Sequence, residues 1–274
     1  MRKIILGLFV LGLSAGATAQ DAAEKKVQAG LVLAFGPTFQ KMGTKIMASD
    51  GAGSEFTIGA NLNFAFNENV GLTTGLEFDF SNLKYKTSQS ESIYYWYNDN
   101  EIFQRDDAAS ATNKDLFLLS SREQKPLYLT IPTMLIFRTN FIGYFRYFGK
   151  FGLRNSFLLK QTINDTGFNH EFDFPGDPLI SSSTVNENMD AKGDMFFFRS
   201  AFGAVGGAEW NFSGSTALSL EIGYYYGFTP LHLDKNEGKT TLYTAGTING
   251  TPDDIHFSNS ATQHQLQFKL SILF

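Results

Sequence analysis

The sequence contains no cysteine, which excludes disulfide bonds, thiolate metal sites and a lipid-modified N-terminal cysteine. It also has no long apolar run, because the stretch from Ile4 to Leu13 is too short to cross a bilayer as a helix. Charged residues make up only 18% of the chain, and the formal net charge is −5. A mildly acidic chain lacks the basic surface that nucleic-acid binding requires, so we expect no nucleic-acid partner.

Residues suited to catalysis are few. The four histidines are His170, His232, His256 and His264. The one GxSxG match, Gly12–Gly16, falls within the N-terminal segment before Ala19, and no HExxH or phosphate-loop motif occurs. The acidic pairs Asp106–Asp107 and Asp253–Asp254 do not have the spacing of a calcium-binding loop. We therefore expect no enzyme activity, no cofactor and no metal. An enzyme at the rim of a membrane barrel, with a loop histidine beside an Asp or Ser, stays open as an alternative.

The N-terminus has the pattern of a secretory signal peptide. Basic residues Arg2 and Lys3 precede the short apolar run, and Ala17-Thr18-Ala19 fits the small-x-small cleavage pattern. We predict cleavage after Ala19, which leaves residues 20–274 as one domain. Removal of Arg2 and Lys3 with this segment moves the formal net charge from −5 to −7.

Aromatic residues and glycine are abundant, with 28 Phe, 11 Tyr and 26 Gly. The last fourteen residues, Ala261 to Phe274, alternate between two faces with a period of two, which is typical of a β-strand. Secreted chains of Gram-negative bacteria that end in such a strand with a terminal Phe resemble outer-membrane β-barrels. In those proteins the last strand closes the barrel, so we expect Phe274 to be an assembly signal read by the barrel assembly machinery.

Seven further segments alternate in the same way and predict strands. They are Val27–Phe35, Glu55–Phe66, Val70–Phe80, Leu127–Phe137, Phe145–Leu159, Asp194–Phe212 and Thr216–Phe228. The connections between all eight strands are long and short in strict alternation. The long ones are Gly36–Ser54, Ser81–Pro126, Lys160–Gly193 and Thr229–Ser260.

This alternation places all long connections at one end of the strands and all short turns at the other. Short periplasmic turns and long outer loops are typical of transmembrane barrels. We therefore predict an all-β fold: an eight-stranded antiparallel up-and-down transmembrane β-barrel with four long extracellular loops. A soluble lipocalin-like barrel is the alternative, but it would bury apolar side chains inside. Here the second face carries Gly, Ser, Asn, Gln and charged residues.

Charged residues in the polar register are expected to face the lumen. They are Glu77, Asp79, Arg146, Lys150, Arg154, Arg199, Glu209, Glu221 and Lys269. Eight strands enclose a space that side chains can just fill, and an unpaired buried charge is costly. A lumen plugged by ion pairs is thus favoured over an ion path.

An aromatic cluster, Tyr94, Tyr95, Trp96 and Tyr97, lies in the longest connection. It suits either a stretch of the aromatic girdle or a recognition surface on a loop. A cap packed over the barrel mouth is equally compatible with its composition.

Two segments resemble a known family. Similarity to the PorT-like outer-membrane β-barrels of Bacteroidota is carried by Tyr128-Leu129-Thr130-Ile131-Pro132-Thr133-Met134-Leu135 and, after the turn Arg138–Tyr144, by Tyr147-Phe148-Gly149-Lys150-Phe151-Gly152-Leu153. The resemblance implies a cell-envelope protein, and the name-giving member acts in type IX protein secretion. A structural or interaction role is therefore expected, with a narrow channel or porin as the alternative. Expected partners are outer-membrane lipids and lipopolysaccharide, the assembly machinery and secretion or envelope proteins. The barrel itself is expected to be monomeric.

Overall fold

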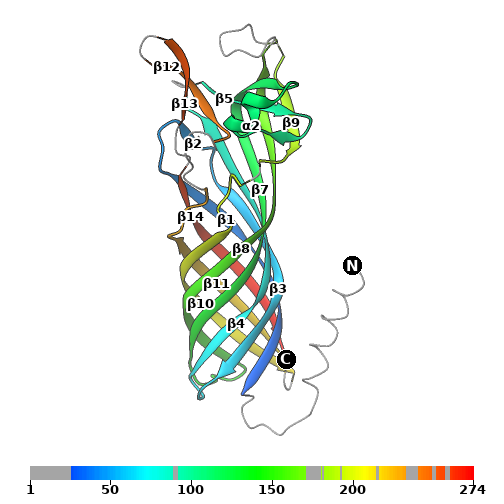
Figure 1. Ribbon diagram of the computed structural model, residues 1–274. Coiled ribbons are helices and arrows are strands. Elements are labelled where there is room, and N and C mark those ends of the chain that lie inside the picture. The colour runs from blue at the N-terminus through cyan, green and yellow to red at the C-terminus, as the bar shows by residue number, and fades with distance from the viewer. Residues whose placement is uncertain are drawn as a thin grey trace.

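The computed structural model describes residues 26–88, 92–170, 180, 182–191, 193–213, 216–232, 240–248, 251–256 and 260–274. The predicted signal peptide lies outside these residues. Eight long strands dominate the fold (Figure 1): β1 (Val27–Met42), β3 (Gly53–Ala65), β4 (Val70–Thr87), β7 (Asp115–Arg138), β8 (Phe145–Asn169), β10 (Phe198–Ser213), β11 (Thr216–Gly227) and β14 (Ala261–Leu273).

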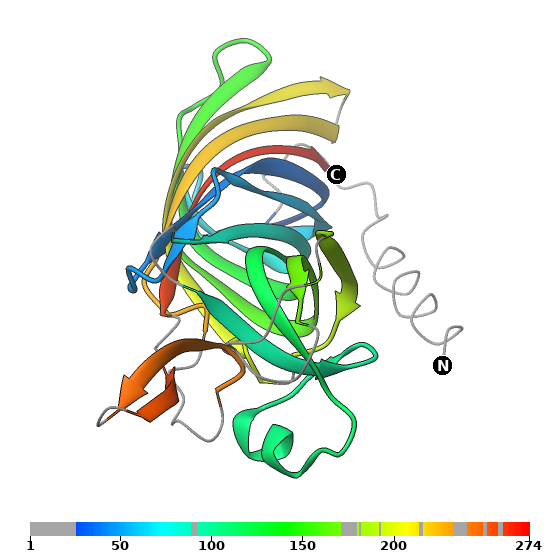
Figure 2. The same ribbon diagram turned by 90° about the horizontal axis from the view of Figure 1, so that it is seen from above.

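These eight strands form a closed ring. Each pairs antiparallel with its neighbours in the order β1, β3, β4, β7, β8, β10, β11 and β14. β14 then pairs with β1 over Gly30↔Leu273 to Met42↔Ala261 and closes the ring. The curved strands around the lumen are visible from above in Figure 2. The predicted eight-stranded antiparallel barrel is confirmed.

Side chains alternate between the lumen and the outside along every strand of the ring, as the period of two requires. On β4, Phe78 and Phe80 are exposed, whereas Glu77 and Asp79 are fully buried. On β14, Phe268 and Leu270 are exposed, whereas Gln267 and Lys269 are buried. A barrel that is apolar outside and polar inside is the arrangement of a membrane protein, not of a lipocalin.

The apolar outer surface covers only part of each strand. It follows Val70–Phe80 of β4 and Leu127–Phe137 of β7, which are 11 residues each and match the length that a tilted transmembrane strand needs, and the longer stretch Phe145–Leu159 of β8. β7 and β8, however, are 24 and 25 residues long. They continue beyond the apolar band at the end that carries the long connections, which we call the outer end.

The long connections are consequently more ordered than the expected loops. Short strands β2 (Met47–Ser49), β5 (Ile93–Asn98), β6 (Glu101–Ile102), β9 (Thr184–Met189), β12 (Tyr243–Ile248) and β13 (Thr251–His256), with helix α2 (Arg105–Ser110), surround the extended β4, β7 and β8. We call this assembly above the band the outer sheet (Figure 1). The predicted loop boundaries at Gly36, Ser81 and Pro126 are wrong, because these residues lie within β1, β4 and β7. The strands continue outside the lipid, where their outward face carries polar residues.

The outer sheet has a hydrophobic core of its own. Buried side chains from β2, β4, β5, β7, β8 and β9 form one cluster, which includes Met47, Leu83, Tyr85, Tyr95, Phe117 and Ile163. This packing explains why the long segments fold onto the barrel mouth. No helix in the described part of the chain is both long and apolar enough to cross a membrane.

Candidate functional site

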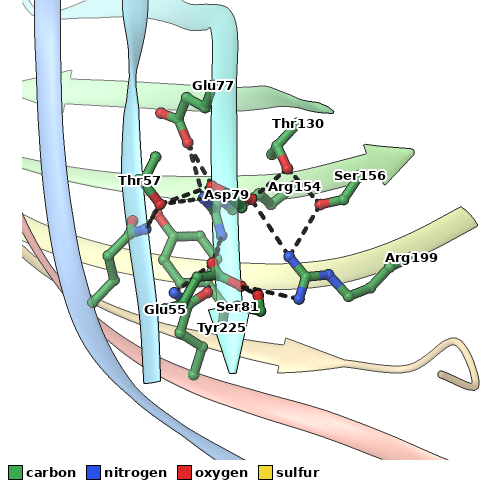
Figure 3. A network of polar contacts seen from close by, with 12 residues as sticks. Glu55, Thr57, Glu77, Asp79, Ser81, Thr130, Arg154, Ser156, Arg199 and Tyr225 are labelled. Atoms are coloured by element: carbon green, nitrogen blue, oxygen red, sulfur yellow. Dashed lines mark hydrogen bonds and ion pairs between the residues drawn. The ribbon is translucent and has the colours of Figure 1, made fainter. Parts of the chain in front are cut away.

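Arg154 of β8 lies at the centre of the lumen and contacts three carboxylates from β3 and β4. Its Nη1 donates to Glu55 Oε1 at 2.9 Å, and its Nη2 donates to Glu77 Oε2 at 3.0 Å and to Asp79 Oδ1 at 2.6 Å. Figure 3 shows the guanidinium between these groups. Each of these residues belongs to the inward register of its strand, so ring closure brings them together.

Two further cations complete this central network. Arg199 Nη1 donates to Glu55 Oε2 at 3.1 Å, and Lys269 Nζ donates to Glu77 Oε1 at 2.6 Å. Hydroxyl groups supply the remaining donors, since Thr57 donates to Asp79 Oδ1 at 2.7 Å. A buried carboxylate is tolerated only when such partners replace water, and here they do.

A second group of charges fills the lumen near the short turns. Glu209 is contacted by Arg146 and, at 3.4 Å, by Arg138. Lys150 Nζ donates to Glu221 Oε1 at 2.7 Å. The structure therefore places all nine charged residues of the predicted lumen set in the interior, each with an opposite charge beside it. Arg146 is the least enclosed, with 16% of its side chain exposed.

The middle of the lumen is filled as well as neutralised. Tyr225 lies across it with its ring 5.4 Å from the Arg154 guanidinium carbon. A Cβ on Gly203 would stand 2.5 Å from carbons of that ring, so glycine is needed there for the close approach. The enclosed space beside Arg154, Arg199 and Tyr225 measures about 10 Å³, roughly the room of one water molecule. Side chains therefore fill the lumen at the level of Arg154 and Tyr225.

A separate ion-pair cluster lies above the apolar band, between the barrel mouth and the outer sheet. Arg122 makes a two-point contact with Asp165, through Nε at 2.9 Å and Nη2 at 2.8 Å. Asp194 lies 3.9 Å from Arg122 Nη1 and accepts a hydrogen bond from Gln124 at 3.2 Å. Gln124 also contacts His232 Nε2 at 2.9 Å. These groups join β7, β8 and the segments after β9 and β11.

Five charged residues of these networks were not among the expected lumen set: Glu55, Arg122, Arg138, Asp165 and Asp194. Glu55 shares the register of Thr57, so the period-two pattern contained its signal. The pattern predicts a strand that ends at Phe137, whereas Arg138 is the last residue of β7. Arg122 and Asp165 lie in segments expected to be loops, and only their burial reveals their role.

The expected aromatic surface is instead part of the outer sheet. Tyr94 and Tyr95 are buried on β5, and the Tyr95 ring packs 5.2 Å from that of Phe117. Trp96 and Tyr97 are half-buried. The prediction of a recognition surface is therefore wrong for Tyr94 and Tyr95. Both belong to strand β5, which pairs with β7, and both side chains are buried within the outer sheet.

The candidate catalytic and metal-binding residues do not converge. His232 is buried and meets Asp194 only through Gln124, while His264 packs against Tyr224 and Tyr226 on the outward face of β14. His170 follows β8, and His256 ends β13. Asp106 and Asp107 are exposed in the first turn of α2, and Asp253 and Asp254 belong to β13. Within the described residues, no group of His, Asp and Glu could hold a metal ion.

The barrel ends where the sequence pattern suggests. Phe274 follows β14, and its backbone N–H donates to the carbonyl of Ala29 at 2.9 Å. The terminal residue therefore takes part in the β1–β14 seam that closes the ring.

His232 should make the outer sheet less stable in acid. Burial lowers the pKa of His232, nearby Asp194 opposes this effect, and Arg122 reinforces it. The unfolded chain then binds the proton more readily, so stability should fall as pH drops through the ordinary histidine value of about 6.5. Protease cleavage of the outer sheet should be faster at pH 5.5 than at pH 7.5. His232→Gln should reduce this difference, and His264→Gln should keep it; an unchanged difference in His232→Gln would contradict the assignment.

Comparison with known proteins agrees with this architecture. Residues 13–233 match the family described as outer membrane protein beta-barrel domain. Among solved structures, Ail of Yersinia pestis aligns with 9% identity over 91% of this chain and 100% of its own, at a TM-score of 0.35. OprG from Pseudomonas aeruginosa aligns with 11% identity over 90% and 95%, also at 0.35. The protease OmpT from Escherichia coli aligns with 8% identity over 94% and 99%, at 0.36.

No curated protein shows a significant sequence match to this chain. Because the TM-scores are low, the assignment rests on the family match and on the strand pairing described above. The match spans most of the sequence, and the closed ring with its apolar outer band is the fold that the family description states. The chain therefore belongs to the outer membrane protein β-barrel domain family and is an outer-membrane β-barrel protein.

Proposed function

We propose that this protein acts in the cell envelope through its outer sheet, with the barrel as a closed anchor in the outer membrane. The filled lumen carries this proposal: ion pairs and Tyr225 occupy it, and the space beside them holds about one water molecule. A barrel without a passage leaves its exposed surfaces as the places where recognition occurs. The proposed role is therefore to support the cell envelope or to bind other envelope proteins, and not to catalyse a reaction.

The finer proposal is a PorT-like accessory role in type IX protein secretion. It is supported by the resemblance of residues 128–135 and 147–153 to that family. A signal peptide cleaved after Ala19 would direct the chain across the inner membrane, and the barrel assembly machinery would insert it as a monomer. A secretion accessory needs a folded surface outside the lipid, and the outer sheet supplies one with its own core.

The test is to replace residues 92–114 with a short Gly/Ser linker. This exchange removes β5, β6 and α2 but keeps Arg122 of β7 as the partner of Asp165 on β8, which a longer exchange from Leu83 to Glu123 would remove. We expect the barrel to stay inserted and to migrate differently on gels before and after boiling. The variant should lose the envelope proteins that co-purify with wild type and should secrete less type IX cargo.

A matched control exchanges the turn Asn67–Asn69 at the opposite end for Gly-Ser-Gly and should retain both properties. Full co-purification and secretion by the 92–114 variant would place the function outside this segment. Stepwise conductance of the wild type in planar bilayers would instead support the narrow-channel alternative.

A further inference from the structure

A group of lysines lies on one side of the barrel, directly above the apolar band. Lys84 and Lys86 are exposed on β4, Lys125 is exposed on β7, and Lys160 is exposed on β8. The pairing Lys84↔Glu123 and Lys125↔Thr162 sets these residues on three neighbouring strands. Their buried neighbours Leu83, Tyr85 and Gln124 point the other way, so the lysines face outward.

Acidic residues neutralise only part of this group. Glu123 is paired with Lys125 at 2.9 Å and Asp50 with Lys86 at 3.4 Å. In the part of the chain that the structure describes, Lys84 and Lys160 make no ion pair. Asp190 also lines the space beside Lys160, so four lysines stand against three carboxylates. A net positive charge therefore remains on the outward face of β4, β7 and β8, which we call the lysine face.

Apolar side chains continue the same face downward into the band. Phe78 and Phe80 on β4 and Phe157 and Leu159 on β8 are exposed below the lysines. On other strands of the ring, β10, β11 and β14 carry outward Phe202, Tyr226 and His264, without a described outward Lys or Arg. Lys41, opposite Thr262 near the outer end of β1, is an exposed cation outside the group, whereas four lysines gather on β4, β7 and β8.

A cleft opens beside Lys160. The β8–β10 pairing ends at Phe198↔Phe157, and the β8–β9 pairing starts at Ile163↔Met189, so β8 has no continuous strand partner on that side between them. The register shift between Leu127 and Tyr128 lies opposite the same segment. The resulting space of about 560 Å³ is lined by Leu159, Lys160, Gln161, Thr162, Asn188, Met189 and Asp190.

We propose that the lysine face binds a phosphorylated glycolipid of the outer leaflet. Such a molecule carries acyl chains and anionic phosphates in one structure, and the face presents apolar side chains directly beneath a cluster of cations. Lysine binds phosphate as a point charge, and basic clusters at a membrane surface recognise anionic headgroups. The acyl chains would lie against Phe78, Phe80 and Phe157, with phosphates at Lys84, Lys125 and Lys160. The cleft beside Lys160 has room for a sugar, with Gln161, Asn188 and Asp190 among its polar lining residues.

The experiment measures lipid retained by the delipidated, refolded full-length protein in micelles. The probe is a bisphosphorylated diglucosamine lipid, compared with its dephosphorylated form bearing the same acyl chains. A triple variant, Lys84→Gln with Lys125→Gln and Lys160→Gln, should bind the phosphorylated lipid about 100-fold more weakly, from roughly fivefold per lysine. The matched control, Lys26→Gln with Lys41→Gln and Lys114→Gln, removes equal charge elsewhere and should bind as wild type does.

Equal binding of the dephosphorylated lipid would overturn the proposal, because the acyl chains alone would then explain retention. Equal losses in both triple variants would also overturn it, as a general effect of net charge. Displacement by inorganic pyrophosphate as effectively as by the lipid would show a free-phosphate site, against a lipid. This inference depends on the outer-membrane location and not on the proposed secretion role, so either can fail alone.

Discussion

Replacing Arg154 with Ala should destabilise the barrel by about 3–5 kcal/mol, the usual cost of removing one partner from a buried ion pair. Arg154 contacts Glu55, Glu77 and Asp79, whose side chains are fully buried. Without the guanidinium, Arg199 and Lys269 alone would have to compensate three carboxylates in the interior of the barrel. Denaturant unfolding in lipid vesicles measures the loss as a shift of the midpoint.

Two matched variants separate this charge effect from a loss of packing. Arg146→Ala should cost at most about 1 kcal/mol, since its side chain is partly exposed and Arg138 still contacts Glu209. Adding Asp79→Asn to Arg154→Ala should recover part of the stability, because one uncompensated charge is then removed. If Arg154→Ala proved no more damaging than Arg146→Ala, the central network would not stabilise the barrel as described.

Replacing Arg122 with Ala should loosen the outer sheet while leaving the barrel inserted. Its guanidinium is the two-point partner of Asp165, whose side chain is fully buried, and it lies beside Asp194. The loss should again be about 3–5 kcal/mol, confined to the region above the membrane. Limited proteolysis of intact vesicles should show rapid cleavage in the outer sheet, with the heat-dependent gel migration of the barrel preserved.

The neighbouring residue provides the control for this second prediction. Glu123 faces outward on the same strand and pairs with the exposed Lys125, so Glu123→Ala should change stability by less than about 1 kcal/mol. Cleavage of Arg122→Ala at the wild-type rate would show that the hydrophobic core of the outer sheet holds it without the ion pair.

The transmembrane part of the fold could be predicted because lipid imposes a strict pattern. Along Val70–Phe80, every second residue must face lipid, and the charged residues Glu77 and Asp79 can only face inward. The same rule gave the correct orientation for Lys269 and Arg199. Above the membrane this rule ends, which is why β5, β9 and β12 were not recognised as strands.

Pairing partners in the lumen could not be predicted, since they come from distant parts of the chain. Arg199 and Glu55 are 144 positions apart and meet only when the ring closes. The register of each strand limits the possible partners but does not choose among them. Tyr225 illustrates the point: its inward direction follows from alternation, whereas its place across the lumen depends on Gly203 in the adjacent strand.

The sequence by itself determined the eight strands, their inward and outward faces and the end at which the long connections lie, because a period of two and turn composition are local properties. The tertiary structure decided which charges pair, that the lumen is filled and that the long connections build a packed sheet. Those features depend on ring closure and on burial of side chains such as Tyr95 and Arg122. Burial depends on residues far away in the chain, and no local pattern specifies it.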